Sequence, residues 1–149
     1  FDSVAKLIRQ KGMITVRRSS SQICDAHSQV FLGDSMGEMM MFYAAADVAF
    51  VGGSLVNIGG HNLLEPASLG KAIICGPSMS NAKDVAEMLF AAGALQIVEN
   101  SAELNLSLDE LLARPSSRDD LGNSALKVIK NNRGALDRLM AFIGQVTEP

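Results

Sequence analysis

Several residue types are scarce in this sequence, and each shortage argues against a class of protein. Tryptophan is absent and aromatic residues make up 5% of the 149 residues, which argues against a surface that stacks the bases of single-stranded nucleic acid. Two cysteines are too few for a disulfide framework, and this fits a reducing compartment. No apolar run is long enough to cross a bilayer. The net charge of −3 gives no general affinity for nucleic acid.

Common site motifs are absent as well. The chain has no G-x-x-x-x-G-K-[ST] phosphate loop, and its glycines do not form the dinucleotide-binding pattern G-x-G-x-x-G. It has no G-x-S-x-G nucleophile elbow. His27, His61 and the two cysteines are not spaced as metal ligands. We therefore expect no metal site and no cofactor.

The composition is that of a globular protein, since apolar residues make up 48% of the chain and charged residues 19%. We expect a single domain over residues 1–149 in which strands and helices alternate. The expected strands are residues 13–16, 29–32, 47–51, 71–76 and 94–98, and the expected helices are 1–12, 37–46, 63–69, 81–93, 101–113, 119–132 and about 135–147. This alternation predicts an α/β fold, a Rossmann-like parallel sheet with helices on both faces.

The most informative stretch is residues 50–71. An apolar strand ends there in two glycines, two more glycines follow, and Asn62 stands where a helix would be capped. Glycines let a backbone approach a ligand closely, and the start of a helix offers unpaired N–H groups to an anion. A phosphate is the expected guest. The alternative is an ordinary loop before a capped helix, in which His61 has no ligand and Glu65 caps the helix instead of binding hydroxyl groups.

Three other loops also follow expected strands. Arg17 and Arg18 form a basic pair that could hold a phosphate or a carboxylate, although a solvated loop is equally consistent with them. Residues 33–38 contain Ser35 and Glu38 at the spacing of a capping box, which is either a second ligand clamp or a plain helix cap. Because ligands of parallel sheets bind outside the carboxyl ends of the strands, we expect these loops and residues 76–81 to converge on one edge.

Three segments together resemble a known family. Residues 32–39 (LGDSMGEM), 46–55 (ADVAFVGGSL) and 59–67 (GGHNLLEPA) are similar to the 3-deoxy-D-manno-oct-2-ulosonic acid (Kdo) transferases of Gram-negative bacteria. Further similarity lies at Gly76-Pro77, Asn81, Lys83-Asp84 and residues 132–136, so that the resemblance covers nearly the whole chain.

The resemblance implies that this chain is the C-terminal, donor-binding half of a GT-B glycosyltransferase. Such enzymes transfer Kdo from CMP-Kdo to lipid IVA in lipopolysaccharide biosynthesis, with inversion, without a metal, at the cytoplasmic face of the inner membrane. The catalytic base, the membrane anchor and the acceptor site of the family belong to the N-terminal half. We expect this fragment to be soluble and inactive alone, and its final helix to pack back toward that half.

The resemblance also implies a set of site residues. The family holds the nucleotide with a Met-Gly-Glu segment and an Asn-Pro-Leu-Glu segment, in which Leu63 here replaces the usual proline. Ala82 stands where an aromatic residue is common, which would loosen part of the donor pocket. We expect the donor-binding residues to be Arg17, Met36, Gly37, Glu38, Ser54, Gly59, Gly60, His61, Asn62, Leu63, Leu64 and Glu65. No catalytic residue is expected in this chain.

Two alternatives stay open on the sequence. The chain could be half of another GT-B transferase that uses a UDP-sugar, or it could be a non-catalytic nucleotide-binding module. Titration with CMP and with UDP would distinguish a Kdo transferase from the first alternative. An assay of sugar transfer after fusion to an N-terminal half would distinguish it from the second.

Overall fold

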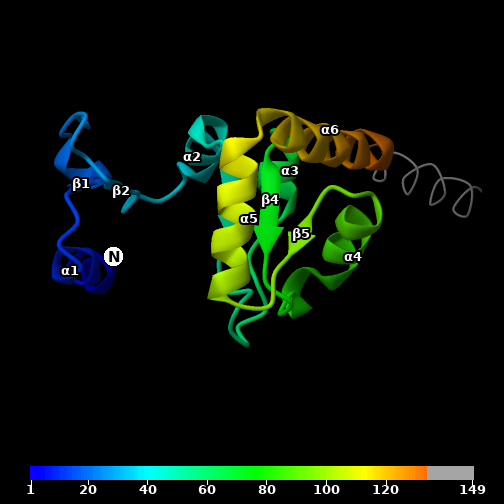
Figure 1. The fold of residues 1–149 in the computed structure, drawn as a ribbon, viewed down its shortest axis with the longest axis horizontal. Helices are drawn as coiled ribbons and strands as arrows, with labels where there is room; N and C mark the ends of the chain where they lie inside the picture. Colours follow the sequence, from blue (N-terminus) through cyan, green and yellow to red (C-terminus); the bar gives the residue numbers. More distant parts are fainter. Residues whose placement is uncertain (134–149) are drawn as a thin grey trace, which may run out of the picture. The chain divides into compact units, whose positions relative to one another are not determined.

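The computed structural model describes residues 1–133 and divides the chain into two compact units, Phe1–Phe42 and Tyr43–Pro149. Each unit is built from parallel strands and helices (Figure 1). The helix expected over about 135–147 lies outside the described residues. The expectation of one domain over residues 1–149 stays a prediction.

The first unit begins with helix α1 (Asp2–Gln10), which leads into strand β1 (Thr15–Arg17), the short 3-10 helix η1 (Arg18–Ser20) and strand β2 (Val30–Leu32). The two strands pair in parallel, with Val16 opposite Phe31. Gly12 follows α1 with φ 72°, a left-handed conformation in which glycine lacks the Cβ clash of other residues. The predicted end of this helix at Gly12 is therefore confirmed.

The second unit contains a three-stranded parallel sheet in the order β3-β4-β5. Helix α2 (Met39–Ala45) spans the boundary between the units. The elements that follow are β3 (Val48–Val51), α3 (Leu64–Ser68), β4 (Ala72–Cys75), η2 (Ser80–Ala82), α4 (Lys83–Ala91), β5 (Gln96–Ile97), α5 (Ser101–Ala113) and α6 (Pro115–Asn132). The predicted parallel α/β fold is confirmed, and the described strands form two sheets, one in each unit.

Strand β4 lies at the centre of the second unit, and all four of its residues are buried. Ile73 and Cys75 belong to a core that includes residues of α3, α4 and α6, whereas Ala72 and Ile74 belong to a core that includes Leu111 of α5. This alternation follows from the two-residue repeat of a strand. Figure 1 shows the result, with α5 and α4 on opposite sides of the sheet.

Several helix boundaries differ from the prediction, among them those of α4, which covers Lys83–Ala91 and not residues 81–93. Two of the differences have a clear cause in the sequence. Helix α6 begins at Pro115 and not at residue 119, because proline is tolerated in the first turn, where its missing N–H has no helical partner. Helix α2 begins at Met39 and not at residue 37, because Gly37 has φ 80° and cannot join a right-handed helix. The capping box predicted for Ser35 and Glu38 is therefore wrong: their side chains hydrogen-bond to each other instead.

Glycines bring α6 very close to the end of α3. A Cβ added to Gly122 of α6 would lie 2.0 Å from the carbonyl oxygen of Gly70, which is a severe overlap with backbone. Gly122 is itself buried. The contact fixes the C-terminal side of α3 against α6, and α3 in turn follows the glycine-rich loop.

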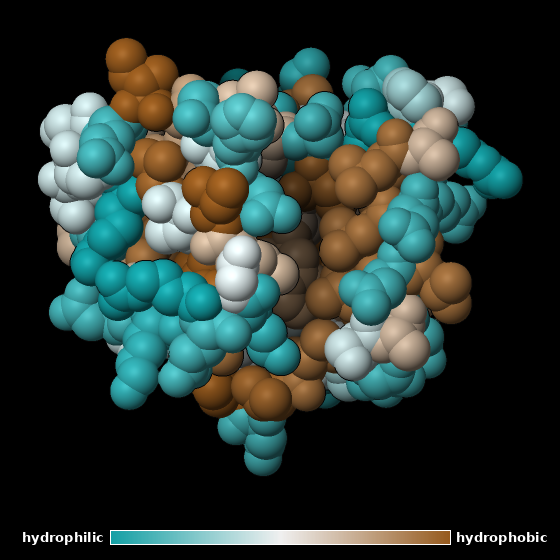
Figure 2. All heavy atoms as spheres, turned by 60° about the vertical axis from the view of Figure 1, so that its left-hand side comes forward, coloured by the Kyte–Doolittle hydropathy of each residue, from teal (hydrophilic) through white to brown (hydrophobic). Residues whose placement is uncertain are grey.

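Within residues 1–133, no helix combines the length and the apolar character that a bilayer-spanning helix needs. Apolar side chains do reach the surface, and Figure 2 shows them gathered in patches among polar residues. Among the exposed apolar residues of the described chain, Leu7 of α1 and Phe90 of α4 are 54% and 57% exposed. Such exposure is common in globular proteins and is not by itself a binding site.

Candidate functional site

The glycine-rich loop between β3 and α3 has a compact backbone. Gly53, Gly59 and Gly60 have φ values of 73°, 100° and 69°, all in the left-handed region that favours glycine. The N–H of Gly60 donates a hydrogen bond of 3.1 Å to the carbonyl of Gly53, which closes the loop on itself. The loop is thus an ordered structure whose shape depends on its glycines.

Ser54 joins this loop to the loop that follows β4. Its side chain is fully buried, its hydroxyl donates to the carbonyl of Val51 at 2.5 Å, and the same oxygen accepts the N–H of Gly76 at 2.7 Å. The N–H of Ser78 donates to the carbonyl of Ser54 at 2.9 Å. The structure therefore places this predicted site residue in the interior, where it links the carboxyl ends of two neighbouring strands.

The two loops also touch at their outer ends. A Cβ added to Gly60 would lie 2.2 Å from the Sδ atom of Met79, and one added to Gly59 would lie 2.7 Å from the Nδ2 atom of Asn81. Side chains at these two positions would therefore collide with the neighbouring loop. The predicted meeting of residues 52–65 with residues 76–81 is confirmed, while the other two candidate loops belong to the first unit.

Four backbone N–H groups in and after this loop are not used in hydrogen bonds within the described residues. In the part of the chain that the structure describes, the N–H groups of Gly59, His61, Asn62 and Leu63 donate to no protein acceptor. Unpaired backbone donors of successive residues form concave anion sites in proteins. This arrangement can hold a phosphate without a lysine or a metal ion.

Helix α3 begins at Leu64, one residue after the predicted start at residue 63, and the Asn62 side chain hydrogen-bonds to this first helical residue. The Oδ1 atom of Asn62 accepts the N–H of Leu64 at 2.9 Å, and its Nδ2 group donates to Oε1 of Glu65 at 3.3 Å. Leu63 is fully buried, whereas Leu64 is 41% exposed. Of this predicted segment, Leu63 anchors the turn in the core, and Asn62 and Glu65 present polar atoms outside it.

Glu65 lies in the first turn of α3 and is partly exposed. The pKa of Tyr43 is raised, first by burial and second by the negative charge of the Glu65 carboxylate. Tyr43 is therefore a neighbour of Glu65 that the sequence analysis did not single out. His61 is exposed, and its ring lies 3.6 Å from the position that a Cβ on Gly53 would occupy.

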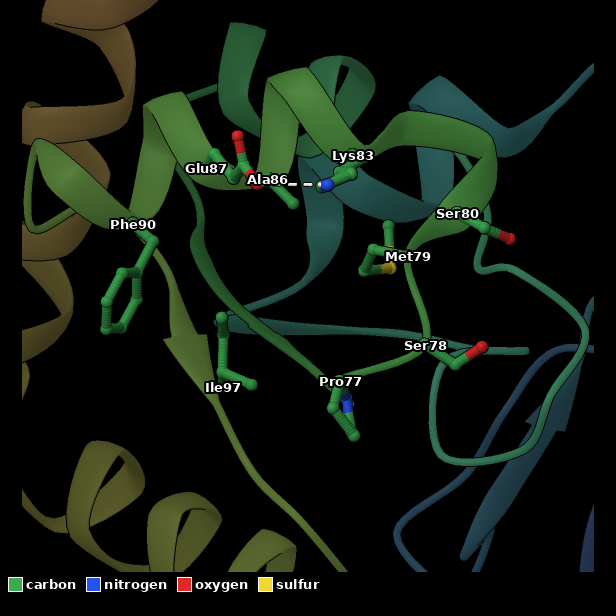
Figure 3. Close-up of a pocket in the computed structure, with 9 residues that line it drawn as sticks. All are labelled: Pro77, Ser78, Met79, Ser80, Lys83, Ala86, Glu87, Phe90 and Ile97. Atoms are coloured by element: carbon green, nitrogen blue, oxygen red, sulfur yellow. Dashed lines mark ion pairs between the residues drawn. The ribbon is translucent and has the colours of Figure 1, made fainter.

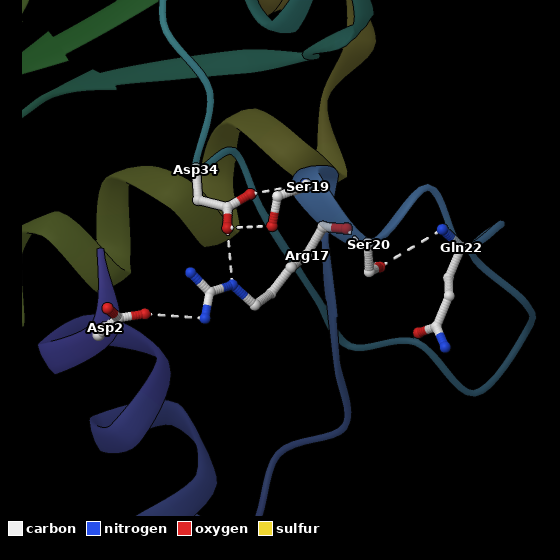
Figure 4. Close-up of polar contacts among 6 residues, drawn as sticks. All are labelled: Asp2, Arg17, Ser19, Ser20, Gln22 and Asp34. Carbon is white, nitrogen blue, oxygen red and sulfur yellow. Dashed lines mark hydrogen bonds and ion pairs between the residues drawn. The ribbon is translucent and has the colours of Figure 1, made fainter.

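Arg17, predicted as a donor-binding residue, is part of a polar cluster in the first unit (Figure 4). Its Nε donates to Asp34 at 2.6 Å and its Nη1 donates to Asp2 at 2.9 Å. The N–H and hydroxyl of Ser19 donate to the same Asp34 carboxylate at 2.8 and 2.6 Å. The Ser19 bonds, followed by Arg17, hold the pKa of Asp34 well below its usual range. The Arg17 charge already has partners within its own unit.

The Met36-Gly37-Glu38 segment is an exposed turn fixed by Glu38. The Glu38 carboxylate accepts hydrogen bonds from the Ser35 hydroxyl and, at 2.8 Å, from Nη2 of Arg18. These two partners, Ser35 first, lower the pKa of Glu38. Met36 is 86% exposed, and a Cβ added to Gly37 would meet no atom within 4 Å. Gly37 is thus required by its positive φ and not by lack of space.

Asp34 and Asn81 were missing from the predicted site residues. Arg17 pairs with Leu32 in the parallel register of β1 and β2, so Asp34 comes two residues beyond the partner of Arg17. An argument from parallel pairing could therefore have found Asp34. Asn81 was noted only for its resemblance to the family, because its contacts depend on how two loops pack.

An apolar pocket of about 380 Å³ lies between α4 and β5, beside the residues that follow β4 (Figure 3). Phe90, Ile97 and Met79 contribute to its lining, and Lys83 and Glu87 form an ion pair at 3.8 Å. The mostly apolar lining gives no reason to place a phosphate here. Within residues 1–133, no group of three or more His, Cys, Asp or Glu residues is arranged to hold a metal ion.

Comparisons with known proteins agree with this arrangement. The family described as "Glycosyl transferases group 1" matches residues 17–128. The 3-deoxy-D-manno-octulosonic acid transferase of Haemophilus influenzae is 40% identical over 96% of this chain, and that of Bordetella pertussis is 39% identical over 97%. The chain spans 34% and 35% of the length of these two relatives.

A solved structure is similar as well. The C-terminal CMP-Kdo binding domain of WaaA from Acinetobacter baumannii superposes with a TM-score of 0.82 at 36% identity, over 86% of this chain and 67% of that one. The comparisons of sequence and of structure thus identify the same group of proteins. The chain belongs to the group 1 glycosyl transferases, it has the parallel α/β fold of a GT-B domain, and its resemblance to the Kdo transferases is confirmed.

Proposed function

We propose that this chain binds CMP-Kdo as the donor half of a glycosyltransferase that transfers Kdo to lipid IVA in lipopolysaccharide biosynthesis. One observation carries the proposal: the C-terminal CMP-Kdo binding domain of WaaA has the same fold at 36% identity. The names of the relatives supply the reaction, because they are Kdo transferases. Inversion and independence of metal are part of the proposal.

The glycine-rich loop is the proposed phosphate site. Among the described residues, the N–H groups of Gly59, His61 and Asn62 have no protein acceptor, so several donors can act on one phosphate together. One helix terminus stabilises an anion by only about 0.3–2 kcal/mol, so a set of donors is needed. Gly59 and Gly60 let this loop pack against Met79 and Asn81, where a Cβ at either position would overlap with the neighbouring loop.

Glu65 is the proposed partner of the ribose hydroxyl groups. Its carboxylate accepts a hydrogen bond from Asn62 at one oxygen, which leaves further acceptor positions for hydroxyl donors. The Met36-Gly37-Glu38 turn is proposed to contact the nucleotide as well. Ser54 and Leu63 are buried, so we assign them a supporting role behind the loop and not a direct contact with the donor.

The remaining parts of the reaction are assigned outside this chain. The catalytic base, the lipid IVA site and the membrane attachment belong to an N-terminal half, and the complete enzyme works at the cytoplasmic face of the inner membrane. The chain alone is therefore proposed to bind the donor without transferring Kdo. No residue of this chain is given a catalytic role.

Calorimetry with CMP and UDP tests the proposal. We expect CMP to bind, UDP to bind much more weakly, and EDTA to change neither result. Preference for UDP would support the UDP-sugar alternative, and a requirement for Mg²⁺ or Mn²⁺ would contradict the metal-free phosphate site. Kdo transfer by the isolated chain would contradict the assignment of the base to another domain.

Glu65→Gln tests the ribose contact and has a matched control in Glu103→Gln. Glu103 lies in the first turn of α5 and accepts a hydrogen bond from the capping Asn100 at 3.0 Å, as Glu65 does from Asn62. Both changes weaken a cap, so both should lower the melting temperature slightly. Only Glu65→Gln should weaken CMP binding. Equal CMP affinity in the two variants would leave Glu65 as a helix cap alone.

A further inference from the structure

Asn81 contacts three successive residues of the glycine-rich loop. Its Nδ2 group donates to the carbonyls of Ile58 and Gly60 at 3.3 and 3.4 Å, and its backbone N–H donates to the carbonyl of Gly59 at 3.0 Å. Asn81 belongs to η2, beyond β4, and is itself exposed. One residue of the neighbouring loop thus binds the carbonyl side of residues 58–60.

These hydrogen bonds hold the part of the loop whose residues have the least intrinsic preference for their observed backbone conformation. Gly59 and Gly60 are both left-handed, and glycine adopts right-handed and extended conformations about as readily. Holding two successive glycines in one conformation costs conformational entropy, which contacts from elsewhere must offset. The bonds from Asn81 are positioned to do this because they bind both glycine carbonyls.

The orientation of the carbonyls also sets the orientation of the N–H groups. A peptide plane carries its C=O and N–H on opposite sides, so carbonyls held toward Asn81 turn the following N–H groups away from it. Peptide 58–59 and peptide 60–61 carry the N–H groups of Gly59 and His61, which have no acceptor among residues 1–133. By binding the carbonyls of these peptides, Asn81 therefore orients the N–H groups that we propose to bind the phosphate.

We propose that Asn81 is a positioning residue that holds the backbone at Gly59 and Gly60 ready to bind the donor phosphate. It touches the loop and not the ligand. The inference rests on the proposed function for the identity of the ligand, but the conformational part concerns the ligand-free chain. It gives a role to a residue outside the expected donor-binding set.

Asn81→Asp tests this role. The new side chain has nearly the same size and shape, but a carboxylate oxygen, which cannot donate a hydrogen bond, faces the carbonyls of Ile58 and Gly60. CMP affinity should fall about tenfold, the factor that corresponds to one net hydrogen bond. Cytidine, which lacks the phosphate, should bind both proteins alike. Asn132→Asp is the matched control, since the Asn132 amide also donates to a backbone carbonyl, that of Val128 at 2.8 Å. It should change neither affinity.

Amide hydrogen exchange of the ligand-free chain supplies the second measurement. The Gly60 N–H should exchange faster in Asn81→Asp than in the unchanged chain or in Asn132→Asp, because its bond to Gly53 depends on the held conformation. Unchanged exchange at Gly60, or equal losses of CMP and cytidine affinity, would overturn the proposal. If the unchanged chain binds no CMP, the proposed function fails, and the exchange comparison still decides whether Asn81 holds the loop.

Discussion

Ser54→Ala removes one oxygen from the point where two strands and two loops are joined. The hydroxyl donates to the carbonyl of Val51 and accepts the N–H of Gly76, and both Ser54 and Gly76 are buried. Alanine fits the same space but provides neither bond. The Gly76 N–H is then left in the interior without an acceptor.

The expected cost follows from this orphaned donor. A buried polar group that loses its partner costs about 1–3 kcal/mol, more than the net value of an ordinary hydrogen bond. For a chain of about this size, 1 kcal/mol lowers the melting temperature by roughly 2–4 °C. Ser54→Ala should therefore melt about 2–12 °C below the unchanged chain. CMP affinity should also fall, since both loops of the proposed site lose their common anchor.

Ser68→Ala is the matched control. The Ser68 hydroxyl donates to the carbonyl of Glu65 in its own helix at 2.8 Å, and within residues 1–133 no N–H donates to this hydroxyl. Thermal melts followed by circular dichroism compare the two variants with the unchanged chain. If Ser54→Ala melts together with Ser68→Ala, the buried hydroxyl does not join the loops as we argue.

Two further predictions concern packing and pH. Gly122→Ala should lower the free energy of unfolding by about 1–3 kcal/mol through overlap with Gly70, despite the gain of about 1 kcal/mol in helix propensity. Asn123→Ala, on the exposed side of α6, gains helix propensity without such an overlap and should not lower the free energy of unfolding in the same urea titration. Asp34 has a lowered pKa, so its ionised form stabilises the fold above pH 4, and this contribution is lost as the pH falls below about 3.8. The stability difference between the unchanged chain and Asp34→Asn should shrink over that range, and a constant difference would contradict it.

The sequence by itself determined the local features of this protein. Gly12 and Asn62 mark helix ends as predicted, and α5 occupies the predicted residues, because caps and periodic apolar patterns act between residues a few positions apart. The order of strands and helices was sufficient to predict a parallel α/β fold. The family resemblance rested on short motifs that are visible in the sequence without a structure.

The start of α2 shows where local reasoning failed. The spacing of Ser35 and Glu38 favoured a capping box, but Gly37 between them is left-handed and Glu38 pairs with Arg18. The competing partner lies 20 residues away in the sequence. A local pattern cannot weigh such a partner. The contact that forms between Ser35 and Glu38 joins their side chains and is not the pair of side-chain to backbone bonds that a capping box makes.

Only the tertiary structure showed which residues support the loops of the candidate site by hydrogen bonds to their backbone. Ser54 was expected to bind the donor, yet it joins Val51 to Gly76, 22 residues away, and Asn81 reaches 21 residues back to Gly60. The sequence also gave no means to distinguish Gly37, which has space around it, from Gly60, which is packed against Met79. These roles depend on distances between segments that meet only when the sheet forms, because hydrogen bonds and steric overlap act over a few ångströms in space, whatever the separation along the chain.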